Sequence, residues 1–166
     1  MDHKTSLTQH IKAPADKVWA VISDIPGSAA TLSGVDSIQM LTQGPYGEGT
    51  RWKESRTMMG RSETVEMWVT QCEPPVPAHG GSAGGGARGG STTVKALQGG
   101  ADYTSRFALA ERDGGTDLTL TFGAELVNPT RLSKIMMAMF GPIGMRITRK
   151  ALAKDLAEIA AKAESL

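Results

Sequence analysis

The sequence predicts one α+β domain, spanning residues 1–166, in which a curved antiparallel sheet wraps around a long C-terminal helix and leaves an apolar cavity between them. Two observations support this fold class. Strand-like segments with one apolar face follow one another through most of the chain, and the last forty residues carry apolar side chains at helical spacing. No β-α-β alternation of about 30 residues is present, which argues against a parallel doubly wound sheet.

Composition supports a folded domain and excludes some partners. Apolar residues make up 40% of the chain and charged residues 21%, as in globular proteins. Lys plus Arg (18) nearly balance Asp plus Glu (17), so no overall field attracts nucleic acid. The apolar stretch from Ile135 to Ile147 is too short for stable membrane insertion. Residues 1–12 do not resemble a signal peptide, and the single cysteine, Cys72, agrees with a reducing compartment. We therefore expect a cytoplasmic protein that is a monomer or a small oligomer such as a homodimer.

The N-terminal part predicts one strand and two short helices. Residues 4–12 alternate between apolar and polar side chains, as in a strand with one wet face. A helix follows, with Pro14 suited to its first position, and Pro26 and Gly27 end it. A second, shorter helical turn is predicted for residues 29–32.

Six further strands are predicted between turn-forming residues, at 35–42, 49–58, 62–72, 92–97, 103–111 and 116–127. The last two form a hairpin around Asp113-Gly114-Gly115. On one face of that hairpin lie Tyr103, Ser105, Phe107, Leu109, Leu118, Leu120 and Phe122.

The C-terminal helix is predicted to begin at Asn128-Pro129 and to be kinked or interrupted at Gly141-Pro142. Its buried face is expected to include Leu132, Ile135, Met136, Met139, Phe140, Ile143, Ile147, Leu152, Leu156 and Ile159.

Three sequence segments carry a family resemblance across nearly the whole chain. They are Ile11–Trp19 followed by Asp24, the segment Gly47–Trp52, and Val69–Pro75; the hairpin that ends in the amphipathic helix follows them. In this order they resemble the polyketide cyclase/dehydrase and START-like superfamily (SRPBCC, Bet v 1-like), whose fold is called helix-grip. The resemblance implies a seven-stranded sheet that grips the C-terminal helix around a hydrophobic pocket.

The chain departs from this family after Pro75, where residues 76–91 form a Gly-rich segment. We expect a flexible loop, because such a composition offers no side chains for a core. The segment contains G-x-G-x-x-G at Gly84, Gly86 and Gly89, but a dinucleotide site needs that motif between a strand and a helix. No cofactor is therefore expected.

Other reactive residues lack the neighbours that their chemistry requires. Cys72 has no histidine near it in sequence to act as a base, so we interpret it as a structural residue. His3, His10 and His79 do not have the spacing of metal ligands, and no metal is expected.

The predicted pocket combines adaptable apolar side chains with the charged side chains of Glu54 and Arg56. The C-terminal methionines suit either core packing or a deformable lining, because thioethers adapt to irregular apolar ligands. If Trp52 points inward, strand alternation carries Glu54 and Arg56 inward too, although charged residues on a strand more often face solvent. Trp68 is then expected to be partly exposed, because Val65, Met67 and Val69 make the better inward set.

These observations favour binding of a small hydrophobic molecule, such as a lipid, an isoprenoid or a polyketide-like compound. The predicted ligand contacts are Trp52, Glu54, Arg56, Met67, Phe107, Leu120, Phe122, Met136, Met139 and Phe140. Two alternatives stay open: a cyclase or dehydratase with Glu54 as the first acid/base candidate, and a protein-interaction or chaperone-cofactor module.

Overall fold

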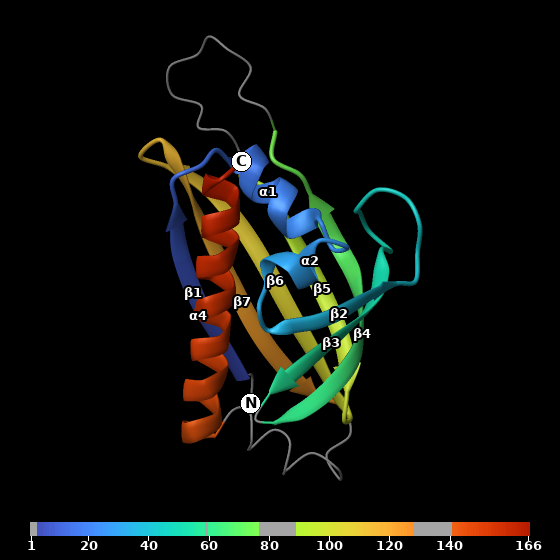
Figure 1. The fold of residues 1–166 in the computed structure, drawn as a ribbon. Helices are drawn as coiled ribbons and strands as arrows, with labels where there is room; N and C mark the ends of the chain where they lie inside the picture. Colours follow the sequence, from blue (N-terminus) through green and yellow to red (C-terminus); the bar gives the residue numbers. More distant parts are fainter. Residues whose placement is uncertain (1–2, 59, 77–88, 128–140) are drawn as a thin grey trace.

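The computed structural model describes residues 3–58, 60–76, 89–127 and 141–166. Its elements follow the predicted order, with two short helices after the first strand and one long helix at the end (Figure 1). They are β1 (His3–Ile11), α1 (Ala15–Ser23), α2 (Ser28–Thr31), β2 (Val35–Met40), β3 (Arg51–Met58), β4 (Arg61–Glu73), β5 (Ser91–Gln98), β6 (Ala101–Arg112), β7 (Gly115–Leu126) and α4 (Pro142–Glu164).

The strands form one antiparallel sheet in the order β1-β7-β6-β5-β4-β3-β2. Consecutive strands pair from β2 to β7, and β1 joins the far edge by pairing with β7. Register shifts at Val35/Ser37 and Val69/Gln71 are irregularities of the kind that bend a sheet. The curved seven-stranded sheet and the helix on its concave side confirm the predicted fold (Figure 1).

Local sequence explains the hairpin between β6 and β7. Asp113 and Gly114 both have positive φ, 51° and 75°, and an Asp-Gly pair is well suited to such a turn. The register that this turn sets places Leu109 opposite Leu118 and Phe107 opposite Leu120, so that all four side chains share one face.

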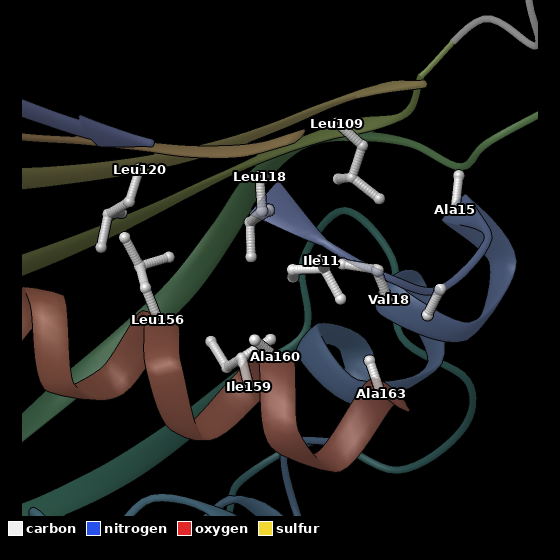
Figure 2. Close-up of a cluster of buried hydrophobic side chains, with 11 residues drawn as sticks. Ile11, Ala15, Val18, Leu109, Leu118, Leu120, Leu156, Ile159, Ala160 and Ala163 are labelled. Carbon is white, nitrogen blue, oxygen red and sulfur yellow. The ribbon is translucent and has the colours of Figure 1, made fainter. Parts of the chain in front are cut away.

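The main apolar cluster joins α1, the second half of α4 and the strands β1, β6 and β7 (Figure 2). We call it the closed cluster. Figure 2 shows Leu118 and Leu120 pointing from the sheet toward Leu156 and Ile159 of α4. Its buried members are Ile11, Ala13, Ala15, Val18, Leu109, Leu118, Leu120, Leu156, Ile159, Ala160 and Ala163.

One part of the predicted helix face is wrong. Ile143 and Ile147 were expected to be buried, but they are 76% and 37% exposed. Gly144 and Thr148 are buried in their place. Ile143 and Ile147 lie on the opposite side of α4 from Leu152 and Leu156, because nine residues separate each pair and correspond to about 180° around the helix axis.

The end of the Gly-rich segment also differs from the prediction. Ser91 belongs to β5, and the carbonyl oxygen of the buried Gly90 accepts a hydrogen bond from the amide of Leu109 at 2.8 Å. Residues 77–88 of that segment, with His79, Gly84 and Gly86, lie outside the described residues, as does the predicted helix start at Asn128-Pro129.

Candidate functional site

Strand β3 presents one side to solvent and the other to α4. Arg51 and Lys53 are exposed, whereas Trp52 is 2% exposed. Glu54 and Arg56 share the side of Trp52, because side chains alternate along a strand. On the outer side the guanidinium of Arg51 lies 5.9 Å from the ring centroid of Trp68, which is partly exposed.

Glu54, Arg56 and Asp155 form a group that we call the polar triad. Arg56 Nε donates to Glu54 Oε1 at 2.6 Å, and Arg56 Nη1 donates to Asp155 Oδ2 at 2.9 Å. Glu54 Oε2 also accepts a hydrogen bond from Trp52 Nε1 at 3.3 Å. Asp155 lies on α4, so the triad connects the sheet to the C-terminal helix.

The triad is largely withdrawn from solvent. The side chains of Glu54 and Asp155 are 12% and 11% exposed, and that of Arg56 is 28% exposed. Gly34 contributes to this packing, because a Cβ at that position would lie 3.2 Å from Arg56 Nη1. Charges in such a place require partners, and each carboxylate has the same guanidinium as its partner.

The environment changes how two members of the triad titrate. Burial raises the pKa of Asp155 above its ordinary value, although Arg56 acts in the opposite direction and Glu54 and Glu158 add to the increase. Burial would lower the pKa of Arg56, but Glu54 and Asp155 outweigh it, and the pKa of Arg56 is raised. Arg56 therefore stays charged, and Asp155 binds a proton more readily than an ordinary aspartate.

Several apolar side chains on the same inner side of the fold as the triad keep part of their surface accessible. Val65 and Met67 lie opposite Glu54 and Trp52 on β4, and Leu152 precedes Asp155 by one helical turn. Phe107 and Phe122 extend this region across β6 and β7. We call Val65, Met67, Phe107, Phe122 and Leu152 the central apolar residues; all are only partly buried.

Buried apolar residues of the described chain form three separate clusters rather than one continuous core. The closed cluster is one of them. A second gathers around Tyr103 and Ala124, and a third around Trp52, Val69 and Ile25. Met67 packs against both the second and the third cluster.

Seven of the ten predicted ligand contacts are described, and all seven face the concave side of the sheet. Trp52, Glu54, Arg56 and Met67 come together on neighbouring strands. Phe107 and Phe122 lie farther along the sheet, and Leu120 is 3% exposed within the closed cluster. Met136, Met139 and Phe140 lie outside the described residues. The role of these residues as ligand contacts stays a prediction.

Sequence reasoning missed Asp155. A signal was available, because Asp155 stands within the apolar spacing Leu152, Leu156 and Ile159, where an acid is unexpected.

Tyr46 was also missed. It donates or accepts a hydrogen bond with Thr92 Oγ1 at 2.6 Å, and burial raises the pKa of Tyr46 to about 12. It therefore remains a neutral phenol that joins the β2–β3 connection to β5.

A second polar group lies apart from the triad: His10 Nδ1 is 2.7 Å from Asp117 Oδ1, and Arg112 Nε is 3.2 Å from Asp117 Oδ2. A cleft of about 380 Å³ lies at the β6–β7 turn, lined by Pro14 and residues 111–115, on elements that do not include the triad. Within the described ranges no cluster of three or more His, Cys, Asp or Glu residues could hold a metal ion, and no helix is long and apolar enough to cross a membrane.

Solved structures with the same fold cover almost the whole chain. The Zhui aromatase/cyclase from Streptomyces sp. R1128 has a TM-score of 0.72 at 15% identity, covering 99% of this chain and 94% of that one. A START superfamily protein from Mycobacterium smegmatis has a TM-score of 0.68 at 14% identity, with 98% of each chain covered. Ara h 8.0201 has a TM-score of 0.65 at 13% identity over 100% of both chains. At these identities the likeness shows a shared fold.

The sequence itself provides the assignment to a family. No curated protein matches the chain in sequence at a significant level. The family model described as polyketide cyclase/dehydrase and lipid transport matches residues 2–164. The chain therefore belongs to the polyketide cyclase/dehydrase and lipid transport family.

Proposed function

We propose that the protein binds a small hydrophobic molecule, such as a lipid, an isoprenoid or a polyketide-like compound, between α4 and the concave face of the sheet. The observation that carries this proposal is the partial accessibility of inward-facing apolar side chains beside a polar triad. Met67, Phe107 and Phe122 belong to the concave face, and each retains accessible surface. The family description, which includes both cyclases and lipid transport, supports the same kind of ligand.

The central apolar residues and Arg56 have different roles in this proposal. The central apolar residues contact the body of the ligand, and the predicted contacts Met136, Met139 and Phe140 would add to them. Arg56 contacts the polar end. A guanidinium has five N–H donors, and two of those of Arg56 are directed to Glu54 and Asp155. The remaining donors can bind a carbonyl or hydroxyl oxygen of the ligand.

Ligand size follows from the energetics of burial. Apolar contact contributes about 25 cal/mol per Å² of buried surface, and association costs several kcal/mol before any net affinity appears. Only a ligand with a large apolar surface can overcome that cost. We therefore expect tight binding of lipid-sized or polyketide-sized molecules and weak binding of small fragments.

The proposal can be tested at two neighbouring positions of β6. Ser105 faces inward between Val94 and Phe122, whereas Thr104 faces the outer side of the sheet. Ser105→Phe should fill part of the proposed space, and Thr104→Phe should add the same ring outside it. In a titration with an environment-sensitive apolar dye, Ser105→Phe should weaken uptake about tenfold or more, whereas Thr104→Phe should leave it unchanged.

The thermal stability of the same two variants distinguishes an open space from a filled interior. If the space exists, Ser105→Phe should melt close to the unaltered protein. In a filled core, overpacking costs about 1–3 kcal/mol, and the dye should not bind even to the unaltered protein. That result would overturn the binding proposal and favour the protein-interaction module.

A cyclase or dehydratase is the second candidate function, and Asp155 is the observation that favours it. A carboxyl with a raised pKa beside a guanidinium can donate a proton to a leaving hydroxyl group, which departs as water. Glu54, within the same triad, can accept the proton from the adjacent carbon so that a double bond forms. Loss of product formation from a β-hydroxy ketone in Asp155→Asn, with dye binding retained, would establish the enzyme; binding without turnover in the unaltered protein would favour the carrier.

A further inference from the structure

The outer face of the first half of α4 combines exposed apolar and basic side chains. Ile143 is 76% exposed and Ile147 is 37% exposed, and they lie one helical turn apart. Arg146, Lys150 and Lys154 are exposed as well, at spacings that place them on the same side of the helix. We call these five residues the basic-apolar face.

Charge on α4 is divided sharply between its two halves. Residues 142–154 contain four cations, Arg146, Arg149, Lys150 and Lys154, and no acid. Residues 155–166 contain the three acids of this region together with Lys162. The chain as a whole carries a formal charge of only +1, so this concentration of positive charge is local.

Nothing in the described part of the chain neutralises these cations. None of the four forms an ion pair there, and Arg149 instead donates to the hydroxyl of Thr5. The neighbouring strand β1 has no acidic residue in its sequence. Figure 1 shows this half of α4 beside β1, away from α1 and α2.

We propose that the basic-apolar face binds the surface of an anionic phospholipid bilayer. The three cations of this face are attracted to the lipid headgroups, and the two isoleucines enter the boundary between headgroups and acyl chains. The helix lies on the surface and does not cross it. Nucleic acid would also attract the cations, but it gives no reason to expose Ile143 between them. Charge and apolar exposure together favour the lipid surface.

Vesicle co-sedimentation tests this proposal with the full chain. The protein should bind vesicles in which about a third of the lipid is phosphatidylserine, bind poorly to vesicles of phosphatidylcholine alone, and dissociate as salt is added. Each cation near such a surface contributes about fivefold to partitioning, so K150Q/K154Q should bind about 25-fold more weakly. Ile143→Ser should weaken binding about tenfold, because it removes an apolar side chain from the interface.

Matched controls keep the test specific. Lys162→Gln lies on the same helix in its acidic half, and Leu41→Ser replaces an exposed apolar residue on the β2–β3 connection, 42% exposed. Both should bind as the unaltered protein does. All of these residues are exposed, so the variants should fold, and a thermal melt of each checks this.

Three results would overturn the proposal. One is equal binding to both kinds of vesicle, and another is equal loss of binding in the control variants. The third is binding to an oligonucleotide that depends on Lys150 and Lys154 but not on Ile143, with no binding to anionic vesicles, which would assign the face to nucleic acid instead.

Discussion

The closed cluster and the polar triad lie on the same concave face, yet their chemistry is opposite. In the closed cluster, Leu118 is 0% exposed and Leu156 is 2% exposed, and apolar side chains meet from both sides. One residue away from Leu156, Asp155 directs a carboxylate to Arg56. Two adjacent residues of α4 therefore have different roles: Leu156 packs in the closed cluster, and Asp155 pairs with Arg56 in the polar triad. A well-packed region can offset the cost of keeping charges partly buried beside it.

Leu118→Ala should produce the largest loss of stability. Removing a fully buried leucine leaves a cavity and costs about 3–4 kcal/mol of the free energy of unfolding. Leu97→Ala is the matched control, because Leu97 is 56% exposed, and its cost should stay below about 0.5 kcal/mol. Urea denaturation measures both. Equal costs would mean that the closed cluster does not dominate the stability of the fold.

Arg56→Met should cost somewhat less, and its cost should depend on pH. The substitution leaves Glu54 and Asp155 without their shared partner, and unpaired buried charges destabilise a fold by about 3 kcal/mol. The cost should shrink as the pH falls from about 7 to about 5, because the unpaired carboxyls can then take up protons. Denaturation at both pH values measures the difference.

Arg51→Met supplies the control from the same strand. The side chain of Arg51 is 52% exposed and pairs with Glu66 on the outer face, where an ion pair contributes about 0–1 kcal/mol. Its effect should be small and independent of pH in this range. A cost for Arg51→Met that matched that of Arg56→Met would show that the inner and outer faces of β3 do not differ as described.

The sheet could be predicted from the sequence because its strands alternate between an apolar and a polar face. On β3 the same alternation placed Trp52, Glu54 and Arg56 on one side, and the structure has them there. On α4 the prediction held for Leu156 and Ile159 but was wrong for Ile143 and Ile147. The reason is physical: Ile147 and Leu156 are nine residues apart on one continuous helix, which places them about 180° apart around its axis, so they cannot share a buried face.

The polar triad was harder to predict from the sequence than the sheet. Glu54 and Arg56 are two residues apart, so their shared face follows from strand alternation. Asp155 is remote from both in sequence, and only the antiparallel sheet closing around α4 brings it to Arg56 at 2.9 Å. An acid within an apolar helix stripe indicates that a partner is needed, but periodicity does not identify that partner.

Asp155→Asn should change the free energy of unfolding least. The pH dependence of that change should be opposite to the pH dependence expected for an ordinary paired acid. The folded state raises the pKa of Asp155 above its ordinary value of 3.8, so the folded protein binds this proton more tightly than the unfolded chain. Below pH 3.8 the resulting stabilisation is fully present. It is lost as the pH rises through the raised pKa, so the unaltered protein should lose stability relative to Asp155→Asn over that interval.

Urea denaturation of the unaltered protein and of Asp155→Asn across this pH interval measures the difference in stability. The same pair of proteins should also be compared in the Arg56→Met background. Arg56 opposes the rise in the pKa of Asp155, so without Arg56 the relative loss of stability should extend to higher pH. If the unaltered protein instead gained stability relative to Asp155→Asn as the pH rose, the ion pair would outweigh burial. Asp155 would then be an ordinary paired carboxylate, which removes the reason to consider it a proton donor and leaves the carrier as the function that the triad supports.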